Sequence, residues 1–217
     1  MLAKMIGNCL LRKKYGCNSL RPSMDSVLSK LRDFESEAGR DYFDAFTRIE
    51  LKKGSFLIRE GEISANLWFL EEGLARLVVR MDKDEVTGDF FFPSEFIDIY
   101  DSSTLKIPSG VTIELLSDSV LYTINWERLE MIKQCYPVLA EIEKMIVASY
   151  LHRMEKRIFE LQALTSTERY VKLIKTHPYM IHQVSLTYIA SYLGITIETI
   201  SRIRKKIKKT PEISQRI

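Results

Sequence analysis

Residues 184–207 read VSLTYIASYLGITIETISRIRKKI, and this stretch decides how the C-terminal part of the chain folds. Its small and apolar residues are spaced for two short helices, Leu186–Leu193 and residues 197–206. Between them, Gly194 can take the positive φ of a tight turn, and Thr196 can cap the second helix. The residues spaced to form one small core are Ile189, Leu193, Ile195, Ile200 and Ile203. The pattern therefore predicts a helix-turn-helix.

The second of these helices presents a face that is suited to reading base pairs. Because Ile200 and Ile203 point inward, the opposite face carries Ile197, Glu198, Ser201, Arg202 and Lys205. Arginine can donate two hydrogen bonds to guanine, glutamate can accept one from cytosine, and serine can do either. Glu198 and Arg202 are four residues apart, so a plain surface ion pair is the alternative, and the two roles are compatible.

The charge of the chain is divided unevenly along its length. Residues 1–23 have net charge +5, and residues 152–217 carry 13 Lys and Arg against 5 Asp and Glu, a net charge of +8. Since the whole chain has net charge +3, residues 24–151 have net charge −10. This layout is typical of an acidic body joined to a nucleic-acid-binding module, and a solvated basic surface is the alternative. The basic side chains that can neutralise phosphates are Arg204, Lys205, Lys206, Lys208 and Lys209.

The middle of the chain has the pattern of an antiparallel β domain. Between residues 49 and 124, short apolar runs with a period of two are separated by Gly54, Gly61, Gly73, Gly88 and Gly110. Residues 24–46 predict a short helix that packs against this domain, with Ser23 or Asp25 as its N-cap. Residues 1–23 form a basic extension, either a disordered arm or a segment before a true initiator at Met24.

After residue 125 the apolar period changes to that of helices. Trp126–Cys135 predicts a short helix, and Pro137 then opens one that runs unbroken to residue 164, roughly 40 Å long. Its apolar residues are spaced like a two-stranded coiled coil and predict a homodimer axis, a single buried helix being the alternative: Val147, Leu151, Met154, Ile158 and Leu161. Residues 165–168, TSTE, predict a capped helix that closes before Pro178, and residues 183–185 predict a brief extended segment.

Composition and motifs exclude several classes of protein. With 217 residues, 46% hydrophobic and 28% charged, the chain is typical of a globular protein. It has no apolar run of about 20 residues and no secretory start, so we expect it in the cytoplasm. Its three cysteines and three histidines show no metal-ligand spacing, and no nucleophile or phosphate-loop motif is present. We therefore expect no enzyme activity, no metal and no bound cofactor. The cysteines are Cys9, Cys17 and Cys135, and the histidines are His152, His177 and His182.

Three stretches together resemble the Crp/Fnr family of bacterial transcription regulators, over nearly all of the chain after Met24. They are residues 59–62, REGE; residues 67–77, LWFLEEGLARL; and residues 195–202, ITIETISR, with its E-x-x-S-R pattern. The resemblance implies a cyclic-nucleotide-binding-like β-roll, a dimerisation helix and a winged helix-turn-helix on a palindromic promoter site. It implies as partners double-stranded DNA, a second copy of the chain and RNA polymerase. The implied DNA-binding residues are Thr196, Ile197, Glu198, Thr199, Ser201, Arg202 and Lys205.

The sequence departs from this family where a cyclic nucleotide would bind. Glu95 and Ser109 match the family's phosphate-binding segment, and with Phe96 they are the candidate ligand-binding residues. The family's glycine and arginine, however, are replaced by Ser94 and Pro108, and proline cannot donate the two hydrogen bonds of an arginine. We therefore expect no cyclic AMP, but another small effector or none. The cysteine spacing does not suit an iron–sulfur cluster, and no histidine in the β domain can ligate haem. The segment after Ile207, with Pro211, is short for a full wing.

These predictions give an α+β chain in four parts. Residues 1–23 are the basic extension, 24–136 an antiparallel jelly-roll β domain, 137–164 the dimerisation helix and 165–217 the winged helix-turn-helix. Two other functions stay open, a small-molecule enzyme of the cupin type and a ligand-binding adaptor that does not bind DNA. The absence of histidine and cysteine between residues 24 and 134 counts against the enzyme, and the set Glu198, Ser201 and Arg202 counts against the adaptor.

Overall fold

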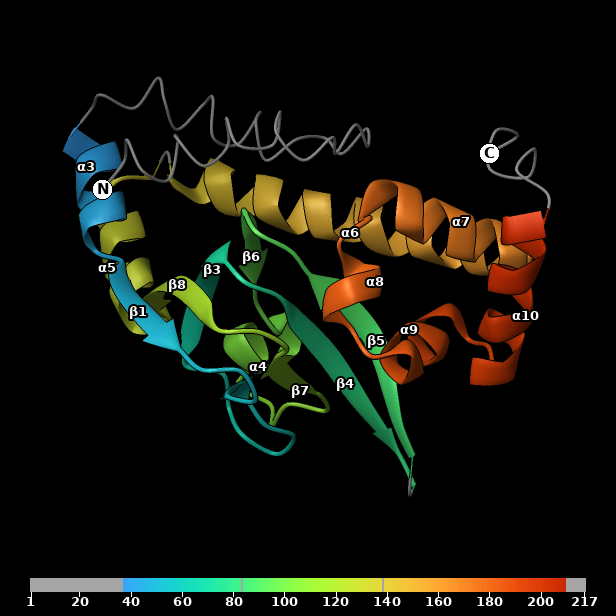
Figure 1. Ribbon diagram of the computed structural model, residues 1–217. Helices are drawn as coiled ribbons and strands as arrows, with labels where there is room; N and C mark the ends of the chain where they lie inside the picture. Colours follow the sequence, from blue (N-terminus) through green and yellow to red (C-terminus); the bar gives the residue numbers. More distant parts are fainter. Residues whose placement is uncertain (1–36, 83, 138, 210–217) are drawn as a thin grey trace.

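The computed structural model describes residues 37–82, 84–137 and 139–209 (Figure 1). Our predictions for the basic extension, for most of the helix at 24–46 and for the wing with Pro211 lie outside these residues. The described part consists of a β domain, one long helix that runs along it and a group of four helices at the far end (Figure 1). The α+β class predicted from the sequence is confirmed.

The β domain contains two four-stranded antiparallel sheets. A cluster of apolar side chains from both sheets fills the space between them, and it includes Trp68, Phe91 and Leu121. One sheet has the order β1 (Thr47–Leu51), β8 (Ser119–Asn125), β3 (Asn66–Glu72), β6 (Glu95–Ile97). The other has the order β2 (Phe56–Ile58), β7 (Thr112–Leu115), β4 (Ala75–Met81), β5 (Asp84–Phe91).

Strand β3 is buried on both faces, because helices cover the outer side of its sheet. Trp68 and Leu70 point between the sheets, whereas Leu67 and Phe69 point to the helices. The strand ends at Glu72, and the next residue, Gly73, has a φ of +113°. A Cβ atom at this glycine would lie 2.1 Å from the Ser119 Oγ atom, so only glycine fits the turn into β4.

Three helices cover this outer side. They are α3 (Glu37–Asp44), α5 (Trp126–Cys135) and the start of α6 (Leu139–Ala163). The Asn125 side chain caps α5 by accepting a hydrogen bond from the Glu127 backbone N–H at 2.8 Å. α6 has 25 residues and is therefore about 37 Å long, close to the length predicted from the sequence. A short helix, α4 (Tyr100–Leu105), follows β6.

The C-terminal helices are α7 (Ser166–Thr176), α8 (Met180–Gln183), α9 (Leu186–Leu193) and α10 (Ile197–Lys209). The capping signal predicted at residues 165–168 is confirmed, since Thr165 and Glu168 form a reciprocal capping box. The prediction for Gln183 was wrong: it ends helix α8, and the extended backbone begins at Val184. No helix among the described residues is both long enough and apolar enough to cross a membrane.

Candidate nucleic-acid interface

Helices α9 and α10 form the predicted helix-turn-helix with the predicted turn chemistry. The Ser185 hydroxyl caps α9 by accepting from the Thr187 backbone N–H at 3.2 Å. Gly194 ends α9 with φ 64° and ψ 40°, a left-handed conformation. A Cβ atom at this position would meet nothing within 4 Å, so the backbone conformation, not lack of space, favours glycine.

Helix α10 is held by one face only. Ile200 and Ile203 are buried with exposed fractions of 0% and 5%, and they pack against Ile189, Ala190 and Leu193 of α9. The side chains on the opposite face are exposed: Ile197, Glu198, Ser201, Arg202 and Lys205. Thr196 is also exposed, and Thr199 is half-buried. The structure therefore places all seven candidate DNA-binding residues in one turn and the helix that follows it.

Hydrogen bonds organise the first turn of α10. The Thr196 hydroxyl accepts from the Thr199 backbone N–H at 3.3 Å, and Arg202 donates to the Thr199 hydroxyl at 3.1 Å. A hydrogen bond from its own backbone N–H, helped by Thr196 and by the charge of Arg202, holds the pKa of the Glu198 carboxyl below its ordinary value. Glu198 is thus a hydrogen-bond acceptor at neutral pH, and Arg202 keeps donors available for a base.

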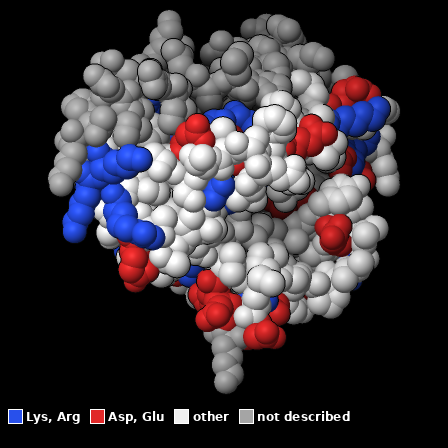
Figure 2. Space-filling model, turned by 90° about the vertical axis from the view of Figure 1, so that its right-hand side faces the viewer, with Lys and Arg blue, Asp and Glu red and all other residues white. Residues whose placement is uncertain are grey.

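Basic side chains lie close to this face. Arg204 is half-buried, and Lys205 and Lys206 are exposed, whereas the side chains of Lys208 and Lys209 lie outside the described part. Figure 2 looks onto the side of the molecule that bears α10; the largest group of blue side chains lies at the left edge, and smaller blue groups lie at the upper right and near the centre, with red side chains between them. The exposed Lys205 and Lys206 are suited to contact with phosphates.

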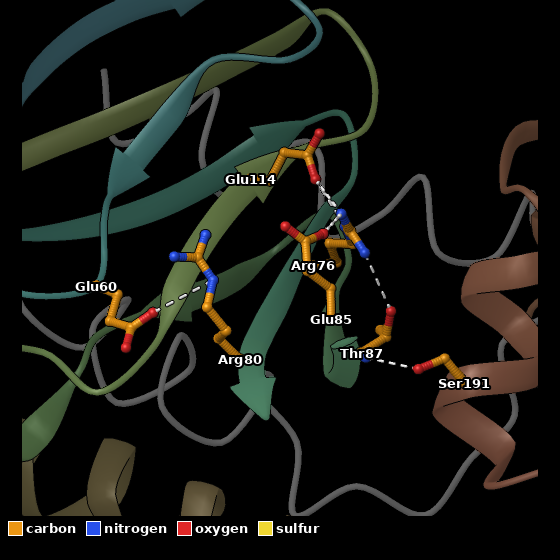
Figure 3. Close-up of polar contacts among 7 residues, drawn as sticks. All are labelled: Glu60, Arg76, Arg80, Glu85, Thr87, Glu114 and Ser191. Atoms are coloured by element: carbon orange, nitrogen blue, oxygen red, sulfur yellow. Dashed lines mark hydrogen bonds and ion pairs between the residues drawn. The ribbon is translucent and has the colours of Figure 1, made fainter. Parts of the chain in front are cut away.

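The β domain holds α9 directly, a feature that the sequence did not indicate. The Thr87 backbone N–H of β5 donates to the Ser191 hydroxyl of α9 at 2.9 Å (Figure 3). The buried Arg76 of β4 lies 3.7 Å above the Tyr188 ring, and ion pairs to Glu114 at 2.7 Å and Glu85 at 3.3 Å hold it there. The position of α9 relative to the β domain is therefore fixed by these side-chain contacts as well as by α6.

A shared apolar core strengthens this attachment. Phe92 stacks on His177 with ring centroids 3.7 Å apart, and Phe90 lies 5.1 Å from Tyr192. Leu74, Phe90, Phe92 and Leu116 of the β domain belong to the same buried cluster as the core of the helix-turn-helix. Because burial of apolar surface drives this contact, the two parts behave as one folded body in this state.

A cavity of about 620 Å³ lies between the β domain and α6 and reaches α7 and α9. Glu95 and Phe96, two of the three candidate ligand-binding residues, line it. Ser109 is not among its lining residues: it is buried, and its hydroxyl donates to the Val111 carbonyl at 2.7 Å. Arg153 was not predicted from the sequence; it reaches the cavity from α6 and forms an ion pair with Glu95 at 3.2 Å. The only signal for Arg153 in the sequence was its place next to Met154, one of the apolar residues that are spaced like a coiled coil.

The charges that the β domain contributes to the cavity do not fit a cyclic phosphate. Every lining residue from the β domain that carries a charge at neutral pH is acidic, namely Asp89, Glu95, Asp98 and Asp101. Lys106, the basic residue nearest in the sequence to Pro108, is exposed at the end of α4 and is not a lining residue. A phosphate would therefore lie against carboxylates without a basic partner from the β domain. The described residues also contain no group of three His, Cys, Asp or Glu placed to hold a metal ion.

Comparison with known proteins agrees with this architecture. Residues 48–134 match the model of the cyclic nucleotide-binding domain. The chain is 24% identical over 177 residues to the transcriptional activator protein Anr of Pseudomonas aeruginosa, covering 76% of this chain and 71% of that one. It is 25% identical over 166 residues to the transcriptional activator protein FnrA of Stutzerimonas stutzeri, covering 70% and 67%.

Solved structures show the same fold. FixK2 from Bradyrhizobium japonicum superposes with a TM-score of 0.65 at 18% identity, covering 76% of this chain and 86% of that one. A regulator assigned to the Crp/Fnr family from Eubacterium rectale superposes with a TM-score of 0.66 at 18% identity, covering 84% and 88%. This chain therefore contains a cyclic nucleotide-binding domain, has the fold of the Crp/Fnr regulators and is homologous to Crp/Fnr-type transcriptional activators.

Proposed function

We propose that the protein is a homodimeric, sequence-specific DNA-binding transcription regulator that acts in the cytoplasm. The observation that carries this proposal is the outer face of α10, where Glu198, Ser201 and Arg202 are exposed on a helix whose other face is buried. A helix held in this way can enter the major groove without breaking its contacts with the rest of the protein. The basic side chains beside it supply affinity for phosphates.

The surface of α6 supports dimerisation. A long helix with a row of solvent-exposed apolar side chains is unusual on a monomer, because their contact with water is unfavourable. A second copy of α6 would cover the row of exposed apolar side chains on this helix and would place two α10 helices for half-sites about 34 Å apart. The exposed apolar residues are Val147, Tyr150, Leu151, Ile158, Phe159 and Leu161.

The proposed division of labour follows the parts of the chain. Residues 24–136 form the effector-type domain, 137–164 the dimerisation helix and 165–217 the DNA-binding unit. In this scheme the cavity does not take cyclic AMP, because the charged side chains that the β domain contributes to its lining are all acidic. RNA polymerase is the expected partner at the promoter, as the activator names of the relatives suggest.

Arg202→Ala tests the base-reading role. Sites are first selected from random duplexes with the wild-type protein, and binding is then measured by gel shift on a selected and a scrambled duplex. We expect the variant to lose about 1–3 kcal/mol on the selected site and to accept other bases at one position of each half-site.

Lys206→Ala is the matched control, because this exposed lysine offers only a charge. It should weaken binding to both duplexes alike and reduce the salt dependence of binding by roughly one phosphate contact. If Arg202→Ala behaves as the lysine variant does, Arg202 does not read bases.

A further inference from the structure

Arg153 reaches from α6 into the cavity and is held there by two strands. Its Nη2 atom lies 3.1 Å from the Asp89 Oδ2 atom of β5, and its Nη1 atom lies 3.2 Å from the Glu95 Oε2 atom of β6. The exposed fractions of the two carboxylate side chains are only 12% and 8%. Removing one partner of a charge pair that is this well shielded from water costs more than removing one partner of a surface pair, because the other charge stays buried and uncompensated.

Aromatic rings complete the surroundings of this guanidinium group. Its central carbon lies 5.1 Å from the centroid of the Phe91 ring and 5.4 Å from that of the Tyr150 ring. Both distances are within the range of a cation–π interaction. Two carboxylates and two rings are suited to a planar cation, which arginine supplies better than lysine does.

Three other cations around the cavity, Arg157, Arg169 and Lys172, are bound elsewhere. Arg157 donates to the Tyr192 carbonyl, and Arg169 donates to the Leu164 carbonyl at 2.7 Å. Lys172 forms an ion pair with Glu160 at 2.7 Å. Arg153 is therefore the cation that the carboxylates of β5 and β6 receive.

We propose that this part of the cavity is a guanidinium site, and that its ligand is the protein's own Arg153. The arginine joins α6 to the β domain, so that this connection needs no diffusible anion. Glu95 has a second task, since it also accepts from the Phe92 backbone N–H at 3.1 Å. The site thus ties the loop before β6 to the middle of the long helix. The proposal rests on these contacts and not on DNA binding.

Replacing Arg153 and then supplying its missing group tests the proposal. Arg153→Ala is expected to lower the Tm of the full chain by roughly 4–8 °C, because it leaves two shielded carboxylates without their cation. Millimolar ethylguanidinium contains the atoms that the substitution removes. It should recover about half of this loss in the variant by binding to the folded state, and should give no increase in the wild type.

Two controls make the result specific. Ethylammonium chloride at equal ionic strength carries the same charge without the planar fork, and it should recover much less. Lys144→Ala removes an exposed ion pair with Glu141 on the same helix and should change the Tm by about 1 °C or less. An Arg153→Ala protein with an unchanged Tm, or with equal recovery by both cations, would overturn the proposal.

Cyclic nucleotides provide an independent arm of the test. Cyclic AMP, cyclic GMP and cyclic di-GMP at millimolar concentration should leave the Tm of the wild type unchanged. A clear increase with any of them would show that the site takes a phosphate and would refute the assignment.

If Arg153→Ala does not fold, Arg153→Lys and Glu95→Gln carry the test, because they nearly conserve volume. Each should lower the Tm, and the double variant should lose clearly less than the sum of the two, since both act on one pair. Additive losses would contradict the proposed contact.

Discussion

Asp98 lies in the cavity wall just after β6, where α6 passes the β domain. Burial raises the pKa of its carboxyl to about 6, against the opposing effect of hydrogen bonds from Ser103 and the Ile99 backbone N–H. Among the described residues its Oδ1 atom has no hydrogen-bond partner. The folded state therefore binds this proton more tightly than the unfolded chain does. The resulting stabilisation is present at low pH and is lost as the pH rises through about 6.

Asp98→Asn should remove the free-energy cost of ionising this buried carboxyl at high pH. At pH 8 the wild type holds a charged, buried carboxylate, and we expect the variant to be more stable by about 1–3 kcal/mol, or roughly 3–8 °C in Tm. At pH 4 the carboxyl of the folded wild type is protonated, so the gain should nearly vanish. Thermal melts at both pH values measure the difference. Asp101→Asn, on the exposed side of α4, is the control and should show no such pH dependence.

Arg76 shows why single residues were harder to place than helices. It lies on the same face of β4 as Leu74 and Val78, and all three are buried with exposed fractions of 3%, 1% and 7%. The alternation of β4 was visible in the sequence, but nothing local revealed that α9 covers this face. Arg153 was missed for the same reason, since its partner Glu95 is 58 residues away. Contacts between distant segments depend on register, which a single sequence specifies poorly.

At the scale of the elements, the helix boundaries were predicted best. The capping box at Thr165, the turn at Gly194 and the start of α10 all depend on neighbours within four residues. The β domain was predicted as antiparallel, but its pairings were not, because β1 pairs with β8 at the other end of the domain. The error at Gln183 arose in a one-turn helix that lacks a side-chain cap.

The contact between α9 and β5 yields a prediction at this scale. Ser191→Ala removes the acceptor of the Thr87 backbone N–H, so this amide should lose its protection against hydrogen exchange. We expect exchange at Thr87 to become roughly tenfold faster, with a decrease in Tm of about 2–4 °C. Hydrogen exchange read by NMR measures both the site and its neighbours. Ser201→Ala, an exposed serine on α10, should leave exchange at Thr87 unchanged; equal acceleration in both variants would contradict the docking role.

For the whole molecule, the exposed row on α6 leads to a prediction about association. Leu151→Glu with Ile158→Glu places charges on side chains that are 58% and 55% exposed, so folding should be little affected. A dimer built on this row would bury those charges, and we expect its Kd to rise at least about 100-fold. Sedimentation velocity over a range of concentrations measures the change. Met131→Glu alters an exposed residue on α5, 59% exposed, and should not change the association state.

The division of charge described the whole chain only in part. An acidic β domain and a basic C-terminal segment suggested two bodies that meet through one helix. The structure instead joins them through Leu74, Phe90, Phe92 and Leu116, which bury against the C-terminal helices. Charge reports the surface of each part, whereas their contact is made by side chains that appear in both parts as ordinary core residues.

That shared core limits how the protein can be recombined. Phe92 stacks on His177, and Arg76 lies over the ring of Tyr188. In each contact, one residue comes before the boundary at residue 164 and the other comes after it. In a chimaera that joins the C-terminal segment of a relative to the β domain and α6 of this chain, the side chains on the two sides of this contact would not match. If the proposed function holds, promoter specificity is therefore better exchanged by replacing a few outward side chains of α10 than by transplanting the segment.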